Sequence, residues 1–237
     1  MKRRFAARHR QQVLVCWGAL ACWSGLGCTD GSEHARAIAV LIDVSGTYAD
    51  QAPQVVKTVK AGILPAMKPT DTLTVIRIDE ASYGQDNIAA KLTLAARRSE
   101  ANAQKLKTAR ALDTFASSVK PARHTDITGA IMLAAEHLRE AEPVHKMMII
   151  FSDLREDLPA GTRRELDEGE LEGMRVLALN VKRLEADNRD PQVYRERMNA
   201  WKRRLQGAGA SEFRVFVDER RLLEGLVSRT NSPPPAR

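Results

Sequence analysis

Short apolar segments and helical stripes take turns along this chain. Apolar segments of strand length occur at 37–42, 72–79, 146–152, 174–181 and 213–217. The first of them, Ala37–Ile42, shows no polar alternation, which is typical of a strand covered on both faces. A further segment at 88–94 is expected to pair with 72–79 as an edge strand.

Between these segments, apolar residues recur with helical spacing. The stripes expected to face the core are Leu106, Ala109, Ala116 and Val119; Ile127, Ile131, Ala134 and Leu138; and Tyr194, Met198, Trp201 and Leu205. Helices are also expected at 49–67 and 219–227. Strands and helices alternate from 37 to 228, which predicts one α/β domain: a doubly wound, mostly parallel sheet with helices on both faces.

The two ends of the chain depart from this pattern. Residues 1–27 join a basic stretch to an apolar one, which is about as long as the core of a secretory signal and shorter than the ~20 residues that span a bilayer. Residues 28–36 are interpreted as a polar tether. Residues 229–237 are interpreted as a disordered, Pro-rich tail. The domain is therefore expected to occupy 37–228.

Cys28 follows Gly25-Leu26-Gly27 and so resembles the lipobox cysteine of bacterial lipoproteins. The resemblance implies export and a lipid anchor on Cys28 that holds the chain to a membrane of the cell envelope, at the cell surface or in the periplasm. Cleavage by the ordinary signal peptidase and an uncleaved anchor are the alternatives. All three cysteines lie at or before position 28. If Cys28 is lipidated, the mature domain has no free thiol, which excludes structural disulfides, zinc–cysteine sites and cysteine nucleophiles.

The net charge of +7 comes mostly from the same N-terminal segment. Residues 1–27 hold five basic side chains and no acidic one, which leaves 32 basic and 30 acidic side chains in the rest of the chain. A nearly neutral domain lacks the basic surface that nucleic acids require. Nucleic acid is therefore not an expected partner.

Residues with oxygen ligands follow the ends of the predicted strands. Asp43, Ser45 and Thr47 come after the first strand at alternate positions, Thr125 opens a helix, and Asp153 follows 146–152. Because the carboxyl ends of parallel strands meet at one edge of a sheet, these side chains are expected to converge. Hydroxyls and carboxylates suit hard divalent cations. Because the set contains only two carboxylates, the cation would remain electrophilic and short of a ligand. The cation could then bind a carboxylate of a partner.

The segment Asp43-Val44-Ser45-Gly46-Thr47, with Thr125 and Asp153, resembles in order and spacing the metal-ion-dependent adhesion site of von Willebrand factor A domains. The resemblance covers roughly 37–228. It implies a Rossmann-like fold whose edge strand near 88–94 is antiparallel, and a protein that binds other proteins rather than an enzyme.

Residue by residue, the resemblance implies that Ser45 and Thr47 ligate Mg²⁺, or Mn²⁺ or Ca²⁺, through their hydroxyls. Asp43 and Asp153 would act mainly through bound water, and Thr125 directly when a partner is present. A protein partner would supply an Asp or Glu to the metal. The chain departs from the family pattern in two places: Thr47 replaces the usual second Ser, and Ser152-Asp153-Leu154 stands where many members have Thr-Asp-Gly.

Plainer interpretations exist for each of these residues. Ser45-Gly46-Thr47, Thr125 and Asp153 are all residue types that cap helices. His124, Glu156 and Asp157 are interpreted as solvated loop or rim side chains, and the basic run 195–204 as the solvated face of a helix.

An enzyme is the alternative function. An apolar strand followed by an Asp and Gly46-Thr47 is similar to the nucleophile loop of haloacid-dehalogenase-type phosphatases, with Asp43 as the nucleophile and Mg²⁺ held by a late acidic motif at Asp153 and Asp157. Ser45 stands where that family has its general acid, and a serine is a poor proton donor at neutral pH. Binding is therefore the favoured function.

Overall fold

The structure, a computed structural model, describes residues 35–140, 145–179 and 190–216. Its elements are β1 (Arg36–Asp43), η2 (Gly46–Gln51), α1 (Ala52–Thr58), η3 (Val59–Ile63), α2 (Leu64–Ala66), β2 (Thr72–Ile78), η4 (Gln85–Asn87), β3 (Ile88–Thr93), α3 (Arg98–Ser118), α4 (Ile127–Glu140), β4 (His145–Phe151), β5 (Met174–Leu179), α6 (Pro191–Gly207) and β6 (Glu212–Phe216). Cys28, the predicted helix at 219–227 and the predicted tail lie outside the described residues.

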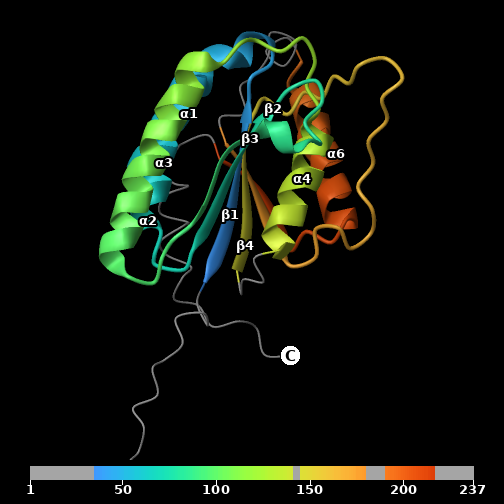
Figure 1. Ribbon diagram of the computed structural model, residues 1–237. Coiled ribbons are helices and arrows are strands. Elements are labelled where there is room, and N and C mark those ends of the chain that lie inside the picture. The colour runs from blue at the N-terminus through green and yellow to red at the C-terminus, as the bar shows by residue number, and fades with distance from the viewer. Residues whose placement is uncertain (1–34, 141–144, 180–189, 217–237) are drawn as a thin grey trace, which may run out of the picture. The chain divides into compact units, whose positions relative to one another are not determined.

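The strands form one six-stranded sheet in the order β3-β2-β1-β4-β5-β6 (Figure 1). Every neighbouring pair is parallel except β2 and β3, which are antiparallel. The predicted fold class is thereby confirmed, including the antiparallel edge strand that the family resemblance implied. The strand order reverses direction on either side of β1, so the carboxyl ends of β1 and β4 mark the place where such sheets bind ligands.

The central strand β1 packs against helices on both of its faces. Ala37, Ala39 and Leu41 belong to the core on one side, together with residues of α4 and α6. Ile38, Val40 and Ile42 belong to the core on the other side, with residues of α1 and α3. Figure 1 shows the same two helical layers. Burial on both faces explains why this strand has no polar alternation.

Burial on the helices follows the predicted stripes with one exception. All four stripe residues of α4 are buried, and Trp201 and Leu205 of α6 are buried too. On α3 the prediction is wrong for Leu106, which is 56% exposed. This helix buries Ala101, Thr108 and Leu112 instead. At 3.6 residues per turn, Leu106 lies roughly 140° around the helix from Ala101, on the face turned away from the sheet.

The helix predicted at 49–67 is a continuous helical segment from 46 to 66 that changes its winding, with a 3-10 turn first and a π-helical stretch at Val59–Ile63. β1 begins at Arg36, which the sequence placed at the end of the tether. The Arg36 guanidinium is buried and pairs with Asp71, which fixes the start of the strand.

Within the three described ranges, no helix is long and apolar enough to cross a membrane.

Candidate metal centre

Asp43 ends β1 and is fully buried. Its Oδ1 accepts hydrogen bonds from the amide (2.8 Å) and the hydroxyl (2.6 Å) of Ser45, and its Oδ2 accepts one from the Ser152 hydroxyl (2.6 Å). Within the described part of the chain, no Lys, Arg or His forms an ion pair with it. Burial raises the pKa of Asp43, and the hydrogen bonds from Ser152 and Ser45 offset part of that rise. Buried charges are normally paired, so an ionised Asp43 carries a negative charge that no described residue balances.

Ser152 contributes to the site although it was not predicted from the sequence. In the register of β1 with β4, Ile42 lies opposite Phe151, so the next residues along, Asp43 and Ser152, lie side by side. The sequence feature that could have identified Ser152 is its position directly after β4, the strand that pairs with β1. Ser152 also accepts a hydrogen bond from the Leu154 amide, which ties the following loop to the same point.

The Ser45 side chain forms a hydrogen bond with Asp43 and does not cap the helix that follows it. Ser45 occupies the N-cap position of η2, but its side chain makes no capping hydrogen bond. Its hydroxyl proton points instead at Asp43, which leaves the oxygen lone pairs able to accept a cation. Gly46 has a φ of 42°, a left-handed conformation that glycine adopts without strain, and this turn lets the chain pass from the strand into η2.

Thr125 does not cap α4 either. Asp126 is the capping residue, because its Oδ1 accepts a hydrogen bond from the Gly129 amide at 2.7 Å. The Thr125 backbone is fixed by two hydrogen bonds to the backbone of Asp157, of 2.7 and 3.1 Å. Its hydroxyl makes no hydrogen bond with the described residues, so it remains available to a ligand.

Asp153 follows β4 and is half-buried. Its Oδ1 accepts a hydrogen bond from the Arg155 amide at 2.8 Å, and no helix begins at this point within the described residues. Asp153 therefore has no helix to cap. Leu154, the next residue, has a φ of 60°, which is rare for a side chain with a Cβ. Glycine adopts this conformation without strain, and glycine is the residue that the family pattern often has at this position.

Ser45, Thr125 and Asp153 line one hollow of about 340 Å³ at the carboxyl edge of the sheet. Its other lining residues are Gly46, Tyr48, Arg123, Arg155 and Asp157. Asp43 lies directly behind Ser45. The predicted ligands Asp43, Ser45, Thr125 and Asp153 are thus brought together. The fifth predicted ligand, Thr47, lies in η2, and its side chain is outside what the structure describes.

These residues fit a hard divalent cation. The set offers two hydroxyls and two carboxylates, one of them buried and without a cationic partner among the described residues, and oxygen ligands of this kind suit Mg²⁺, Mn²⁺ or Ca²⁺. In the described ranges, no three His, Cys, Asp or Glu side chains gather as a metal cluster. The candidate site differs from such a cluster because half of its oxygen-bearing side chains are hydroxyls, which leaves it with little negative charge of its own.

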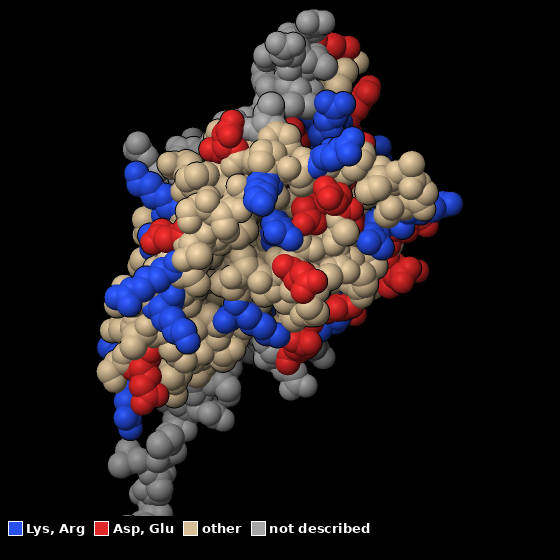
Figure 2. Space-filling view, turned by 45° about the horizontal axis from the view of Figure 1, so that its top comes forward, with Lys and Arg blue, Asp and Glu red and all other residues tan. Residues whose placement is uncertain are grey.

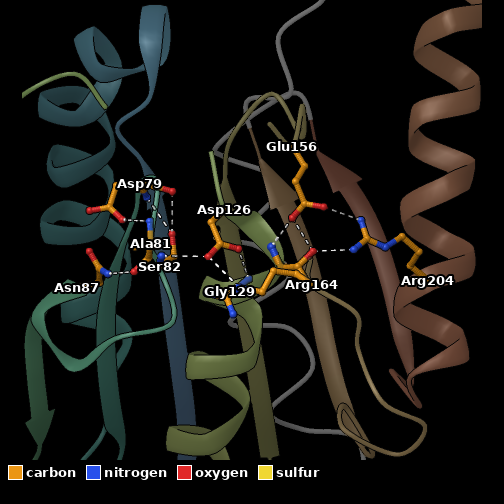
Figure 3. A network of polar contacts seen from close by, with 10 residues as sticks. Asp79, Ala81, Ser82, Asn87, Asp126, Gly129, Glu156, Arg164 and Arg204 are labelled. Atoms are coloured by element: carbon orange, nitrogen blue, oxygen red, sulfur yellow. Dashed lines mark hydrogen bonds and ion pairs between the residues drawn. The ribbon is translucent and has the colours of Figure 1, made fainter. Parts of the chain in front are cut away.

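The rim residues divide into two kinds. Asp157 lines the hollow, and its Oδ2 lies 3.1 Å from His124 Nδ1, as suits rim side chains. Glu156 is not a rim charge, and that interpretation is wrong. Its Oε1 accepts hydrogen bonds from the amide and hydroxyl of Thr128, and its Oε2 pairs with Arg204 of α6 (Figure 3). Glu156 therefore joins the loop of Asp153 to the start of α4.

A second buried carboxylate, Asp126, lies at the centre of Figure 3. It accepts hydrogen bonds from the amides of Ser82 and Gly129, and it forms an ion pair with Arg164 at 3.2 Å. A Cβ added at Gly129 would lie 2.3 Å from Asp126 Oδ2, so only glycine allows this close approach. Asp126 was not identified from the sequence either, although its position directly before the first residue of α4 is typical of an N-cap.

Neither a family model nor a curated protein matches this chain. Among solved structures it is similar to a von Willebrand factor type A protein from Catenulispora acidiphila, with 11% identity and a TM-score of 0.46 over 83% of this chain and 42% of the other. It is also similar to BatB from Bacteroides thetaiotaomicron, with 12% identity and a TM-score of 0.45 over 83% of this chain and 98% of the other. A third similar structure is the manganese-loaded TRAP protein of Plasmodium vivax, with 11% identity and a TM-score of 0.40 over 86% of this chain and 67% of the other.

The sheet defines the fold. A doubly wound, mostly parallel α/β sheet with one antiparallel edge strand is the Rossmann-like architecture of a von Willebrand factor A-like fold. The chain spans 42% of the length of the Catenulispora protein, so that protein's other regions have no counterpart in the alignment.

Proposed function

We propose that this chain is a non-enzymatic, divalent-metal-dependent protein-binding module of the bacterial cell envelope. The observation that carries the proposal is the buried Asp43 carboxylate, which has no ion-pair partner in the described part of the chain and lies behind a hollow lined by hydroxyls. A bound Mg²⁺, or Mn²⁺ or Ca²⁺, would supply the Lewis acidity that holds a partner's Asp or Glu.

The chain's own residues would divide the work of holding the cation. Ser45 and Thr125 offer hydroxyl oxygens toward the hollow, and Thr47 is proposed to add a third. Asp153 contributes a half-buried carboxylate to the wall of the hollow. Asp43 balances the charge from behind Ser45. It accepts a hydrogen bond of 2.6 Å from the Ser45 hydroxyl, which makes that hydroxyl oxygen a better ligand.

The contacts of Asp43 weigh against the phosphatase alternative. A nucleophile must reach its substrate, but Asp43 is fully buried and does not line the hollow. Both of its oxygens accept hydrogen bonds from serines, which lowers their reactivity toward phosphorus. The position of a general acid is occupied by Ser45, whose hydroxyl already donates a hydrogen bond to Asp43.

Titration calorimetry with Mn²⁺ and Mg²⁺ tests the proposal. Wild type is expected to bind one cation, and Ser45→Ala is expected to weaken binding at least about tenfold, because a direct ligand is lost. Ser117→Ala, an exposed serine of α3 whose hydroxyl donates to a carbonyl of its own helix, is the matched control and should bind as wild type does. Absence of cation binding by wild type would overturn the proposal.

An assay with an aryl phosphate separates the two functions. The binding function predicts no turnover with Mg²⁺ present. Turnover that Asp43→Asn abolishes would establish the phosphatase instead.

Export and anchoring are proposed from the sequence of residues 1–28, with export based on the basic and apolar stretches and the lipid anchor on Cys28. Labelling with radioactive palmitate in a bacterial host, with Cys28→Ser and Cys22→Ser as a pair, tests the anchor. Label that is lost only in Cys28→Ser supports lipidation, and label that is absent from wild type contradicts it.

A further inference from the structure

Two arginines line the candidate metal hollow. Arg123 and Arg155 are exposed, and both contribute to its wall. Neither guanidinium makes an ion pair or hydrogen bond with the described residues. Arg164 and Arg204, which lie deeper at the same edge of the sheet, are both paired with carboxylates. The two guanidinium groups that face the proposed binding site are thus available to a ligand.

These arginines set the charge of the hollow. Arg123 and Arg155 balance Asp153 and Asp157, so the four charged side chains in the wall cancel. The Asp43 carboxylate behind Ser45 is then the one acidic group of the candidate centre without a balancing positive charge in that wall. A divalent cation added beside it would make the site positive. Figure 2, with the edge at the top of Figure 1 tilted forward, shows basic and acidic side chains intermingled on this side.

We propose that the partner is an acidic protein segment that presents at least two carboxylates, one to the cation and another to Arg123 and Arg155. The inference rests on the proposed function and adds to it the chemistry of the partner. A guanidinium binds a carboxylate through two parallel hydrogen bonds, which adds direction to the attraction. A single carboxylate at the cation would leave both arginines unpaired.

The same charges couple the cation to the partner. The arginines repel a cation that enters alone, and an acidic segment removes that repulsion when it binds. Each ligand therefore raises the affinity for the other, and the effect is reciprocal. Phosphate is the less suitable anion, because its second charge would lie against the carboxylates of Asp153 and Asp157.

The first test is Mn²⁺ calorimetry on the protein without a peptide. The double variant Arg123→Ala/Arg155→Ala is expected to bind Mn²⁺ about three- to tenfold more tightly than wild type, because two repelling charges are gone. Arg98→Ala, at the start of α3 and therefore near the opposite edge of the sheet, is the matched control and should leave the affinity unchanged. Equal affinity in wild type and the double variant would overturn the inference while leaving the metal site intact.

The second test uses fluorescein-labelled peptides and anisotropy with saturating Mn²⁺. Wild type is expected to bind hexaglutamate at least about tenfold more tightly than a Gly-Ser peptide with a single Glu, and EDTA should abolish both. The double variant should lose the preference, and Arg123→Lys/Arg155→Lys should keep only part of it. The Arg98→Ala control should retain it.

Three outcomes of the second test overturn the inference. They are an unchanged preference in the double variant, failure of wild type to bind either peptide although it binds Mn²⁺, and displacement of hexaglutamate by an equal concentration of inorganic phosphate. A wild type that binds no Mn²⁺ in the first test would instead remove the proposed function itself. The two failures are therefore distinguishable.

Discussion

Asp43 and Asp126 are both fully buried near the carboxyl edge of the same sheet, and they are balanced in opposite ways. Asp126 has everything it needs within the chain: two backbone amides and the Arg164 guanidinium. Asp43 has two serine hydroxyls and one amide, and no ion pair with the described residues. Burial without a balancing charge raises the pKa of Asp43.

This difference separates a carboxylate that stabilises the fold, Asp126, from one that is suited to binding a ligand, Asp43. A buried charge that is paired and capped stabilises its surroundings, so Asp126 fixes the start of α4. A buried charge that lacks a cation destabilises the empty site, and that is the condition under which a bound cation contributes most. If this comparison is right, disturbing Asp126 should cost stability and disturbing Asp43 should cost binding.

The largest expected effect is on the Asp126 side, at Gly129. In Gly129→Ala, the new Cβ would lie 2.3 Å from Asp126 Oδ2, and we expect a loss of about 3 kcal/mol in the free energy of unfolding. Gly207→Ala at the end of α6 is the matched control, because no atom lies within 4 Å of its added Cβ. Urea unfolding measures both. A loss below about 1 kcal/mol for Gly129→Ala would mean that the hydrogen-bonded surroundings of Asp126 are not rigid.

A pair of isosteric variants compares the two carboxylates directly. In EDTA, Asp126→Asn is expected to destabilise the domain by about 2 kcal/mol, because Arg164 loses its partner. Asp43→Asn is expected to stabilise it by about 1 kcal/mol, because an unbalanced charge is removed, and to abolish Mn²⁺ binding. Urea unfolding and calorimetry give both quantities. Equal destabilisation by the two variants would contradict the comparison.

The pH dependence gives a third, smaller effect. Because the pKa of Asp43 is raised in the folded state, the folded protein holds this proton more tightly than the unfolded chain does. Protonated Asp43 therefore adds to the stability of the folded protein. This contribution is complete at pH values below the ordinary pKa of 3.8, and it is lost as the pH rises through the raised pKa of the folded state. In EDTA, the stability of wild type relative to Asp43→Asn should therefore fall as the pH rises from about 4 toward neutral, with a slope of at most about 1.4 kcal/mol per pH unit. A constant difference would show that the pKa of Asp43 is the same in the folded and unfolded states.

The sheet was predictable because its signals are local. The unbroken apolar run of β1 follows from burial on both faces, and the stripe of α4 follows from one wide buried face. Leu106 shows the limit, since α3 covers the sheet with a narrow face and the apolar spacing alone did not identify it. The edge strand at 88–94 was also expected from the sequence, whereas its antiparallel direction came from the family resemblance.

The sequence predicted where the candidate ligands lie in the fold, but it did not predict their hydrogen-bond partners. Asp43, Ser45, Thr125 and Asp153 follow strand ends or open a helix, and parallel topology alone brings them together. Which hydroxyl bonds to which carboxylate depends on the register of β1 against β4, which the sequence does not reveal. For the same reason Ser152 was missed, and Glu156 was interpreted as a rim charge although it pairs with Arg204.

The smallest effect concerns the loop that follows β4 and completes the surroundings of Asp43. The Leu154 amide donates to Ser152 Oγ, which donates to Asp43, and Leu154 has a φ of 60°. At an ordinary loop position, a protein with glycine is less stable than one with alanine by about 0.4–1 kcal/mol, because glycine gives the unfolded chain more conformational freedom. At a left-handed position the order reverses, so Leu154→Gly should be more stable than Leu154→Ala by roughly 1 kcal/mol.

Both variants lose the buried leucine side chain, so their difference isolates the backbone. The matched pair Leu158→Gly and Leu158→Ala lies in the same loop, at a residue that has no positive φ, and should show the ordinary order. Urea unfolding in EDTA measures all four variants. If alanine is the more stable replacement at both positions, the left-handed turn at Leu154 contributes no strain. The loop of Asp153 would then owe its conformation to the hydrogen bonds of Ser152 and Trp201, the second of which donates from its Nε1 to the Leu154 carbonyl at 2.8 Å.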